Sequence, residues 1–149
     1  MLEFILKIVT PEKVLFNQKV SQVSVATIQG EITILPHHLP LVSQLKSGEI
    51  FIKHGQNQEV LLAVSGGFIE VLPEQVVILA DTAERAEDID EAEAAAAHRR
   101  ATELLKTKVA DAREFAFFTA QMEKELARLR VARKHKLRAV RTGFRPEGE

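Results

Sequence analysis

The sequence predicts an α+β fold in which an N-terminal antiparallel β-sandwich is followed by a C-terminal two-helix hairpin. Residues 2–80 hold short apolar runs separated by turns with Gly or Pro, a pattern typical of a sandwich or barrel. Residues 74–142 contain neither Gly nor Pro, the residues that cost a helix interior about 1 and about 3 kcal/mol. We therefore expect a β domain over residues 1–84, a helical domain over 88–140 and a tail over 141–149.

The first predicted strand has the alternation of a sheet with one strongly apolar face. Leu2, Phe4, Leu6 and Ile8 recur at every second position before a turn at Pro11. Further strands are expected at residues 20–27, 32–35, 41–45, 49–53, 58–64, 68–72 and 76–80. Turns are expected between them, among them residues 46–48, so that no segment of helical length lies within the β domain.

Residues 30–40 end a strand in two prolines, Pro36 and Pro40. Proline has no backbone N–H and a fixed φ, so the chain must leave the sheet here and run as a rigid surface loop. The adjacent His37 and His38 raise the possibility of a metal site. Neighbouring side chains of an extended chain point to opposite sides, and no Asp, Glu or Cys stands at a ligand spacing. Packing within the loop or against a partner is the favoured role for the histidines.

Gly66 and Gly67 predict a tight turn or bulge in which side chains do not fit. They do not form a phosphate-binding loop, because neither a Lys nor a further Gly follows them at the start of a helix.

The helical region is expected to begin around residues 83–91, with Asp88 and Glu91 as a capping box. Its first apolar face is narrow and mostly alanine; it comprises Ile89, Ala92, Ala96, Arg100 or Ala101, and Leu104. A more apolar stripe follows at Phe115, Phe118, Met122, Leu126 and Leu129, with the turn between the helices near residues 106–110. Alanine buries little apolar area at about 25 cal/mol per Å². Two possibilities therefore stay open, a permanently folded hairpin and one that opens or extends.

The charge distribution is uneven although the formal net charge is only −1. Residues 124–145 carry many cations and one acid, Glu125, which favours an acidic partner. A solvated helix C-terminus is the alternative. A nucleic-acid-binding or scaffold module with a basic helical arm is a second function to weigh. The chain has no Tyr or Trp on which bases could stack.

Composition gives no support to an enzyme or a membrane span. The chain has no cysteine, hence no thiolate nucleophile or thiolate metal site, and no Ser/His/Asp arrangement is evident. No apolar run approaches the roughly 20 residues of a membrane helix, and the N-terminus lacks the basic start of a signal peptide.

Three motifs in order resemble the epsilon subunits of bacterial F-type ATP synthases. They are Gly-Glu-Ile-Thr-Ile-Leu-Pro-His-His-Leu-Pro at residues 30–40, Ser-Gly-Gly-Phe-Ile-Glu-Val at 65–71, and Leu-Ala-Asp-Thr-Ala-Glu-Arg-Ala-Glu-Asp-Ile-Asp at 79–90. The resemblance covers residues 2–140. It implies a sandwich and a hairpin in a rotor subunit without catalysis of its own, which couples proton flow to ATP synthesis and lies peripherally at the cytoplasmic face of the cell membrane.

The resemblance also implies partners and contact residues. The sandwich would pack on the gamma subunit and the c-subunit ring through Glu31, Pro36, His37, His38 and Pro40. The helices would fold down or extend along gamma into the alpha/beta catalytic hexamer and suppress ATP hydrolysis. The cations expected to contact the beta subunits are Lys124, Arg128, Arg130, Arg133 and Lys134.

Some members of this family bind ATP between sandwich and hairpin. The positions that match approximately are Glu84, Ile89, Asp90, Arg100, Lys124 and Arg128. Glu93 stands where the family motif has an arginine. Because a carboxylate repels phosphate and a charge-assisted contact is lost, the resemblance implies weak or absent ATP binding as a regulatory ligand, and no other cofactor.

Overall fold

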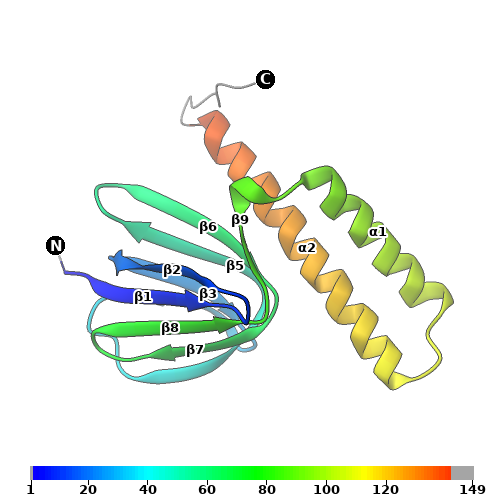
Figure 1. Cartoon of the computed structure of the whole chain (residues 1–149), viewed down its shortest axis with the longest axis horizontal. Coiled ribbons are helices and arrows are strands. Elements are labelled where there is room, and N and C mark those ends of the chain that lie inside the picture. The colour runs from blue at the N-terminus through cyan, green and yellow to red at the C-terminus, as the bar shows by residue number, and fades with distance from the viewer. Residues whose placement is uncertain (1, 142–149) are drawn as a thin grey trace. The chain divides into compact units, whose positions relative to one another are not determined.

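The computed structural model describes residues 2–141, which form two compact units that meet in sequence between Arg85 and Ala86 (Figure 1). The first unit is built from strands. They are β1 (Phe4–Val9), β2 (Val14–Val20), β3 (Gln22–Thr27), β4 (Gly30–Ile34), β5 (Leu41–His54), β6 (Gln58–Val64), β7 (Gly67–Val71), β8 (Gln75–Ala80) and β9 (Ala83–Arg85). The second unit holds a 3-10 turn, η1 (Ala86–Asp88), and two helices, α1 (Glu91–Thr107) and α2 (Ala112–Arg141).

The strands form two layers that share one long strand. Sheet A runs β2-β1-β8-β7 and ends on the first residues of β5, whose Leu41 lies opposite Val71. Sheet B runs β4-β3-β5-β6-β9 and uses the later part of β5. Because β5 passes from one sheet to the other, the sheet curls on itself and encloses an apolar interior (Figure 1).

The interior of the β unit is mostly aliphatic, with Phe4 and Phe16 also buried in it. Its largest fully buried side chains include Leu6, Ile50, Leu62, Ile69 and Ile78, contributed by both sheets. Alternate residues of β1 are buried, with Phe4, Leu6 and Ile8 pointing inward, as the sequence pattern predicts. The predicted α+β class, with strands followed by two packed helices, is confirmed.

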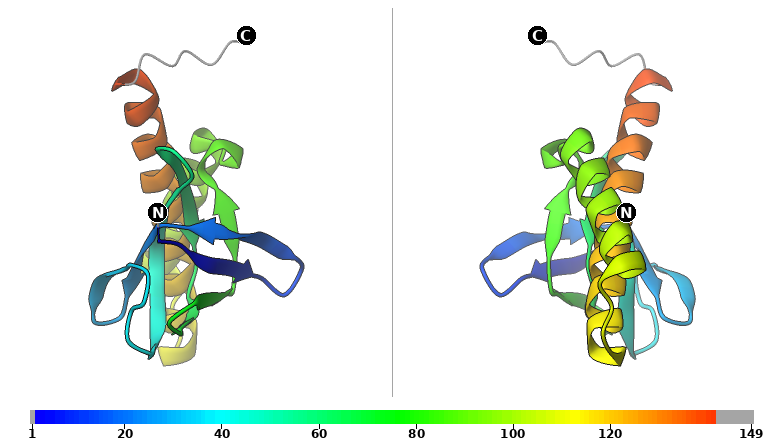
Figure 2. Two further views of the ribbon diagram at one scale, coloured as in Figure 1. Left: turned by 90° about the vertical axis from the view of Figure 1, so that its left-hand side faces the viewer. Right: turned by 90° about the vertical axis from the view of Figure 1, so that its right-hand side faces the viewer.

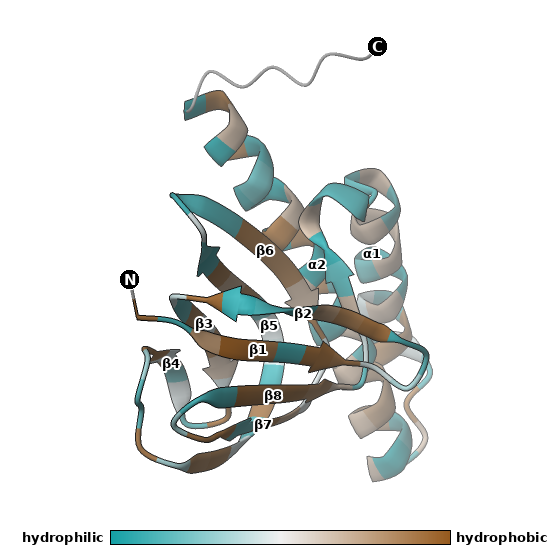
Figure 3. Cartoon of the chain, turned by 60° about the vertical axis from the view of Figure 1, so that its left-hand side comes forward, coloured by the Kyte–Doolittle hydropathy of each residue, from teal (hydrophilic) through white to brown (hydrophobic). Residues whose placement is uncertain are grey.

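The prediction of a fully antiparallel sheet is wrong at one pairing. β1 and β8 run parallel, with Leu6 opposite Val76 and Ile8 opposite Ile78, whereas the remaining paired strands are antiparallel. Both strands are apolar on successive residues and therefore appear mostly brown in Figure 3. Such runs are typical of parallel strands.

Strand β2 was not predicted from the sequence. Only Phe16 and Val20 of its seven residues are buried, and Asn17, Gln18 and Lys19 interrupt the apolar pattern. It lies at the edge of sheet A against β1. Polar and charged residues are the usual composition of an edge strand that avoids pairing with other chains.

The predicted turn at residues 46–48 is absent, because β5 continues from Leu41 to His54. The register against β3 shifts between Val25 and Thr27, which pair with Ile50 and Leu45. At this irregularity a Cβ on Gly48 would lie 3.0 Å from the Cβ of Ala26. The glycine thus allows two strands to approach closely where β5 changes sheet, and it does not mark a reversal.

Gly66 and Gly67 behave as the sequence predicts. Both have positive φ, 70° and 118°, in the bend between β6 and β7. A Cβ on Gly67 would lie 2.0 Å from the carbonyl oxygen of Leu79 on β8, so no side chain fits there.

The helices of the second unit form an antiparallel hairpin joined by a short connection after Thr107, so the predicted position of the turn is confirmed. Figures 1 and 2 agree in placing α1 and α2 side by side. On α1 the fully buried residues are Ala94 and Ala101. The predicted apolar face is right at Ala101 and at the half-buried Ile89, Ala96 and Leu104. It is wrong at Ala92, which is exposed.

Three further predictions about the helices are corrected. The first three residues of the predicted helical start at 83–91 are not helical, because Ala83–Arg85 is strand β9 and pairs with β6; the 3-10 turn begins at Ala86 and α1 at Glu91. The N-cap of α1 is Asp90 and not Asp88; its side chain accepts a hydrogen bond from the backbone N–H of Glu93 at 3.1 Å. On α2, Phe115 was assigned to the apolar stripe but is 57% exposed. The predicted tail lies outside the described residues beyond Arg141.

Candidate interaction surfaces

The loop between β4 and β5 contains four of the predicted contact residues, Pro36, His37, His38 and Pro40. His37 has a φ of 61°, a left-handed conformation that is rare for a residue with a side chain. Its backbone N–H donates to the carbonyl oxygen of Pro73 at 3.3 Å, which ties this proline loop to the β7–β8 turn. This hydrogen bond therefore fixes the position of the loop relative to the sheet.

The histidine side chains differ in surroundings. His38 is half-buried, and its Nδ1 lies 2.7 Å from the carbonyl oxygen of Leu39. His37 is exposed and lines a surface hollow of about 390 Å³ together with Lys19 and Glu74. Within residues 2–141 no three His, Cys, Asp or Glu side chains are grouped in a way that could hold a metal ion.

Glu31, the fifth predicted contact residue, lies at the other end of β4. It is exposed and stands opposite Ala26 of β3. A strand rises about 3.3 Å per residue, so Glu31 is roughly 10 Å from Ile34, where the strand ends. The structure thus places Glu31 and the proline loop at opposite ends of one strand.

Sequence reasoning missed an apolar patch on the outer side of sheet A. Phe68 of β7 and Leu79 of β8 are directly paired and are 54% and 55% exposed. Val42 of β5 is 70% exposed and pairs with Glu70, diagonal to Phe68. We refer to Val42, Phe68 and Leu79 as the apolar outer face. A signal was present in the sequence, since residues 76–80 are apolar without alternation.

Helix α2 carries all five cations predicted to contact an acidic partner. Arg128 and Arg133 are among those that contact carboxylates of the same hairpin. Arg128 contacts Glu93 of α1 at 2.9 Å and Glu125 of its own helix at 2.8 Å. Arg133 contacts Glu91 at 3.3 Å, and Lys136, which was not on the predicted list of contacts, contacts the same carboxylate at 2.6 Å. The pairs join the start of α1 to the later part of α2.

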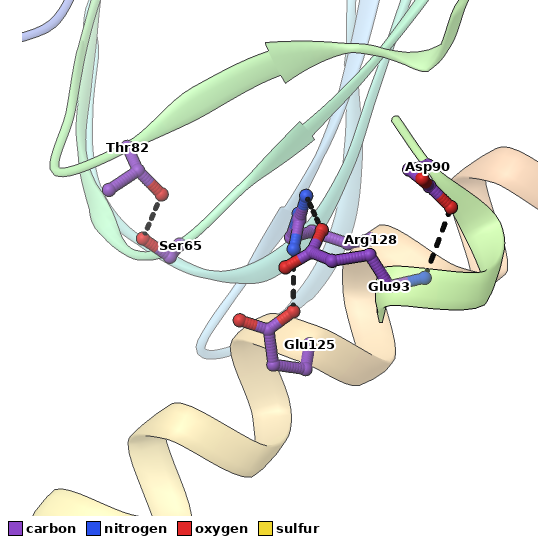
Figure 4. Close-up of polar contacts among 6 residues, drawn as sticks. All are labelled: Ser65, Thr82, Asp90, Glu93, Glu125 and Arg128. Atoms are coloured by element: carbon purple, nitrogen blue, oxygen red, sulfur yellow. Dashed lines mark hydrogen bonds and ion pairs between the residues drawn. The ribbon is translucent and has the colours of Figure 1, made fainter. Parts of the chain in front are cut away.

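Figure 4 shows the guanidinium of Arg128 between the carboxylates of Glu93 and Glu125. The side chains of Arg128 and Glu125 are only 14% and 12% exposed, so water screens this pair less than the others. At Glu91, the hydrogen bond from Lys136, followed by that from Arg133, lowers the pKa of the carboxyl below its ordinary value of 4.5.

The residues that approximately match the family's ATP motif are divided between the two units. Glu84 belongs to β9, whereas Ile89 and Asp90 precede α1 and Arg100 is exposed on it. The side chain of Asp90 is used as a helix cap. Lys124 and Arg128 lie on α2, where Arg128 is held by two carboxylates. One of these carboxylates is Glu93, the residue that stands in place of the motif's arginine.

Together these features define an interaction subunit, a β unit with an apolar outer face followed by a hairpin with a cationic second helix. Residues 3–86 match the family described as "ATP synthase, Delta/Epsilon chain, beta-sandwich domain". The chain belongs to the ATP synthase epsilon chain family. It is accordingly an epsilon subunit of F-type ATP synthase, a non-catalytic part of that complex.

Two curated relatives illustrate how far the similarity extends. The ATP synthase epsilon chain of Dehalococcoides mccartyi is 44% identical over 131 residues, which are 88% of this chain and 93% of the relative. That of Chloroflexus aggregans is 46% identical over 134 residues, 89% of this chain and 94% of the relative. The similarity therefore includes most of the helical unit as well as the β unit.

Two solved structures share the fold. A chain of the Euglena gracilis mitochondrial ATP synthase aligns with a TM-score of 0.75 at 22% identity, covering 92% of this chain and 82% of that chain. A chain of the central stalk and c-ring of the Tetrahymena thermophila mitochondrial ATP synthase aligns with a TM-score of 0.62 at 13% identity, covering 87% and 96%. No helix among residues 2–141 has the length and apolar character needed to cross a membrane.

Proposed function

We propose that this subunit docks on the rotor through its β unit and restrains ATP hydrolysis through its helices. The gamma subunit would cover the apolar outer face and the proline loop, while Glu31 would face the c-subunit ring. The observation that carries the docking role is the exposure of Val42, Phe68 and Leu79 on one face of sheet A. Large apolar side chains gathered on one face mark an interaction site.

The helical unit supplies the second part of the proposed function. Lys124, Arg128, Arg130, Arg133 and Lys134 follow one another along α2, a helix of 30 residues that is long enough to reach deep into a partner at about 1.5 Å per residue. Their charge suits acidic loops of the beta subunits in the alpha/beta hexamer. Held in this complex, the subunit would be peripheral at the cytoplasmic face of the membrane.

ATP hydrolysis by the matching catalytic core with its gamma subunit tests this proposal. The core would be assayed alone, with the full chain and with a chain that ends after Glu87. We expect both chains to bind and only the full chain to suppress hydrolysis. Equal activity with both bound chains would contradict an inhibitory role for the helices, and failure of both to bind would contradict the docking role.

Binding of ATP to the subunit itself is expected to be weak or absent. Glu93 occupies the position of the motif's arginine and contacts Arg128, a cation that the motif would direct to phosphate. Equilibrium dialysis of the full chain against labelled ATP at millimolar concentration would test this expectation. Saturable binding in the micromolar range would contradict it.

A further inference from the structure

The ion pairs within the hairpin engage some cations of α2 and not others. Arg128, Arg133 and Lys136 contact carboxylates at the start of α1; we call them the paired cations. Among the described residues no ion pair is recorded for Lys124 or Arg130. The cations that α2 offers to an acidic partner are therefore not equally available while the hairpin is closed.

The carboxylates on α1 are Glu91 and Glu93, in its first turn. Acidic side chains at a helix N-terminus stabilise the helix through its dipole. That effect requires no contact with a second helix. Here both side chains reach across to α2, and Glu91 contacts two cations at once. With Glu125, three carboxylates contact three cations, so the closed hairpin compensates the charges of Arg128, Arg133 and Lys136.

We propose that Glu91 and Glu93 act as an internal substitute for the acidic partner of α2, so that the closed hairpin masks the paired cations. The inference rests on the proposed function in one respect, the identity of the partner as an acidic protein surface. Hairpin closure and partner binding then compete for the same guanidinium and ammonium groups. Opening the hairpin releases Arg133 and Lys136, while Arg128 keeps its contact with Glu125 on the same helix.

The masking is reversible because the ion pairs of Arg133 and Lys136 with Glu91 lie in contact with solvent. The side chains of Arg133 and Lys136 are largely exposed, 61% and 70%, and exposed ion pairs are weak and sensitive to salt. The apolar contribution to closure is small as well, since the fully buried residues of α1 are alanines. A partner with several carboxylates can therefore displace Glu91 and Glu93.

Full-length variants with matched charge test the masking directly. The variant Glu91→Gln/Glu93→Gln removes both masking carboxylates. The control Glu103→Gln/Glu123→Gln removes the same charge from exposed positions on the same two helices. Binding to poly-L-glutamate, a chemical stand-in for an acidic surface, would be measured at several NaCl concentrations. Far-UV circular dichroism would verify that helix content is retained.

We expect the first variant to bind poly-L-glutamate about 3- to 10-fold more tightly than the control, the size expected for releasing the exposed pairs of Arg133 and Lys136. The gain should shrink as salt rises. Equal binding by the two variants would overturn the proposal. If the double variant loses helix content, Glu91→Gln alone leaves the Glu93–Arg128 contact in place and should still bind more tightly than Glu103→Gln; equality of these two would also overturn it.

Inhibition of the matching catalytic core separates this inference from the proposed function. If the masking holds there, Glu91→Gln/Glu93→Gln should reach half-inhibition at a several-fold lower concentration than the control. If the wild-type chain binds without inhibiting, the inhibitory role fails, and the poly-L-glutamate result still decides the masking. If the wild-type chain inhibits and both variants inhibit equally, the masking fails and the proposed function stands.

Discussion

Gly67 stands where any side chain would collide with the neighbouring strand. Its φ is 118°, and a Cβ would lie 2.0 Å from the carbonyl oxygen of Leu79. Gly67→Ala is therefore expected to destabilise the β unit by about 2–4 kcal/mol, from backbone strain together with the forced separation of β7 and β8. Urea unfolding followed by circular dichroism would measure the loss.

Gly30 provides a matched control for Gly67. Its φ of 122° is equally unfavourable for a side chain, but a Cβ there would meet nothing within 4 Å. Gly30→Ala should cost only the strain, about 1–2 kcal/mol. If the two variants lose the same free energy of unfolding, the collision with Leu79 contributes nothing.

The carboxyl group of Glu91 links hairpin stability to acid pH. Lys136 and then Arg133 lower its pKa in the folded hairpin below 4.5. Because the folded pKa is the lower one, the stabilisation is fully present above the unfolded pKa and is lost as pH falls through the folded pKa. Wild type and Glu91→Gln should therefore differ in stability at neutral pH and converge as pH falls through the folded pKa of Glu91.

Thermal unfolding of both chains between pH 7 and pH 3, followed at 222 nm, would show this convergence. A difference that stays constant down to pH 3 would mean that the ionised carboxylate does not stabilise the hairpin. Glu103→Gln, which alters an exposed acid on the same helix, controls for the change in net charge.

At the scale of single elements, the start of α1 offers two aspartates as caps. The side chain of Asp90 accepts a hydrogen bond from the N–H of Glu93, whereas Asp88 ends the preceding 3-10 turn. Asp90→Ala should destabilise the helical unit by about 0.5–2 kcal/mol, and Asp88→Ala should change it by less than about 0.5 kcal/mol. Loss of helix signal in a urea titration would measure both; the reverse order would make Asp88 the cap.

Local patterns predicted those elements whose residues determine them locally. The alternation of Phe4, Leu6 and Ile8 indicated β1, and the glycines at 66 and 67 indicated a bend without side chains, because each signal lies within a few residues. The turn between the helices was also predictable from the change of apolar stripe near residues 106–110. These features need no knowledge of distant strands.

Other elements depend on distant parts of the chain. Gly48 resembles a turn residue, yet its role is to admit Ala26 of another strand. The parallel pairing of β1 with β8 joins residues about seventy positions apart. Likewise, the cationic run on α2 was visible in the sequence, but the contacts of Arg128 and Arg133 with Glu93 and Glu91 depend on how the hairpin packs.

At the scale of the whole molecule, the two units differ in what stabilises them. The buried cluster of large aliphatic residues lies entirely between Phe4 and Ala80. The helical unit has alanines and a few larger apolar residues in its interior, with ion pairs between its helices. The β unit therefore contains the apolar burial required for independent folding.

A chain that ends after Glu87 should consequently unfold in one cooperative transition with its sheet intact. Gly67→Ala makes the test quantitative. If the β unit folds independently of the helices, this substitution lowers the free energy of unfolding by the same amount in the full and the shortened chain. The loss caused by this substitution should agree within about 0.5 kcal/mol between the full and the shortened chain. A larger disagreement, or a shortened chain without a cooperative transition, would show that the β unit depends on the helices for its stability. A loss of inhibition on truncation could then not be assigned to the helices alone.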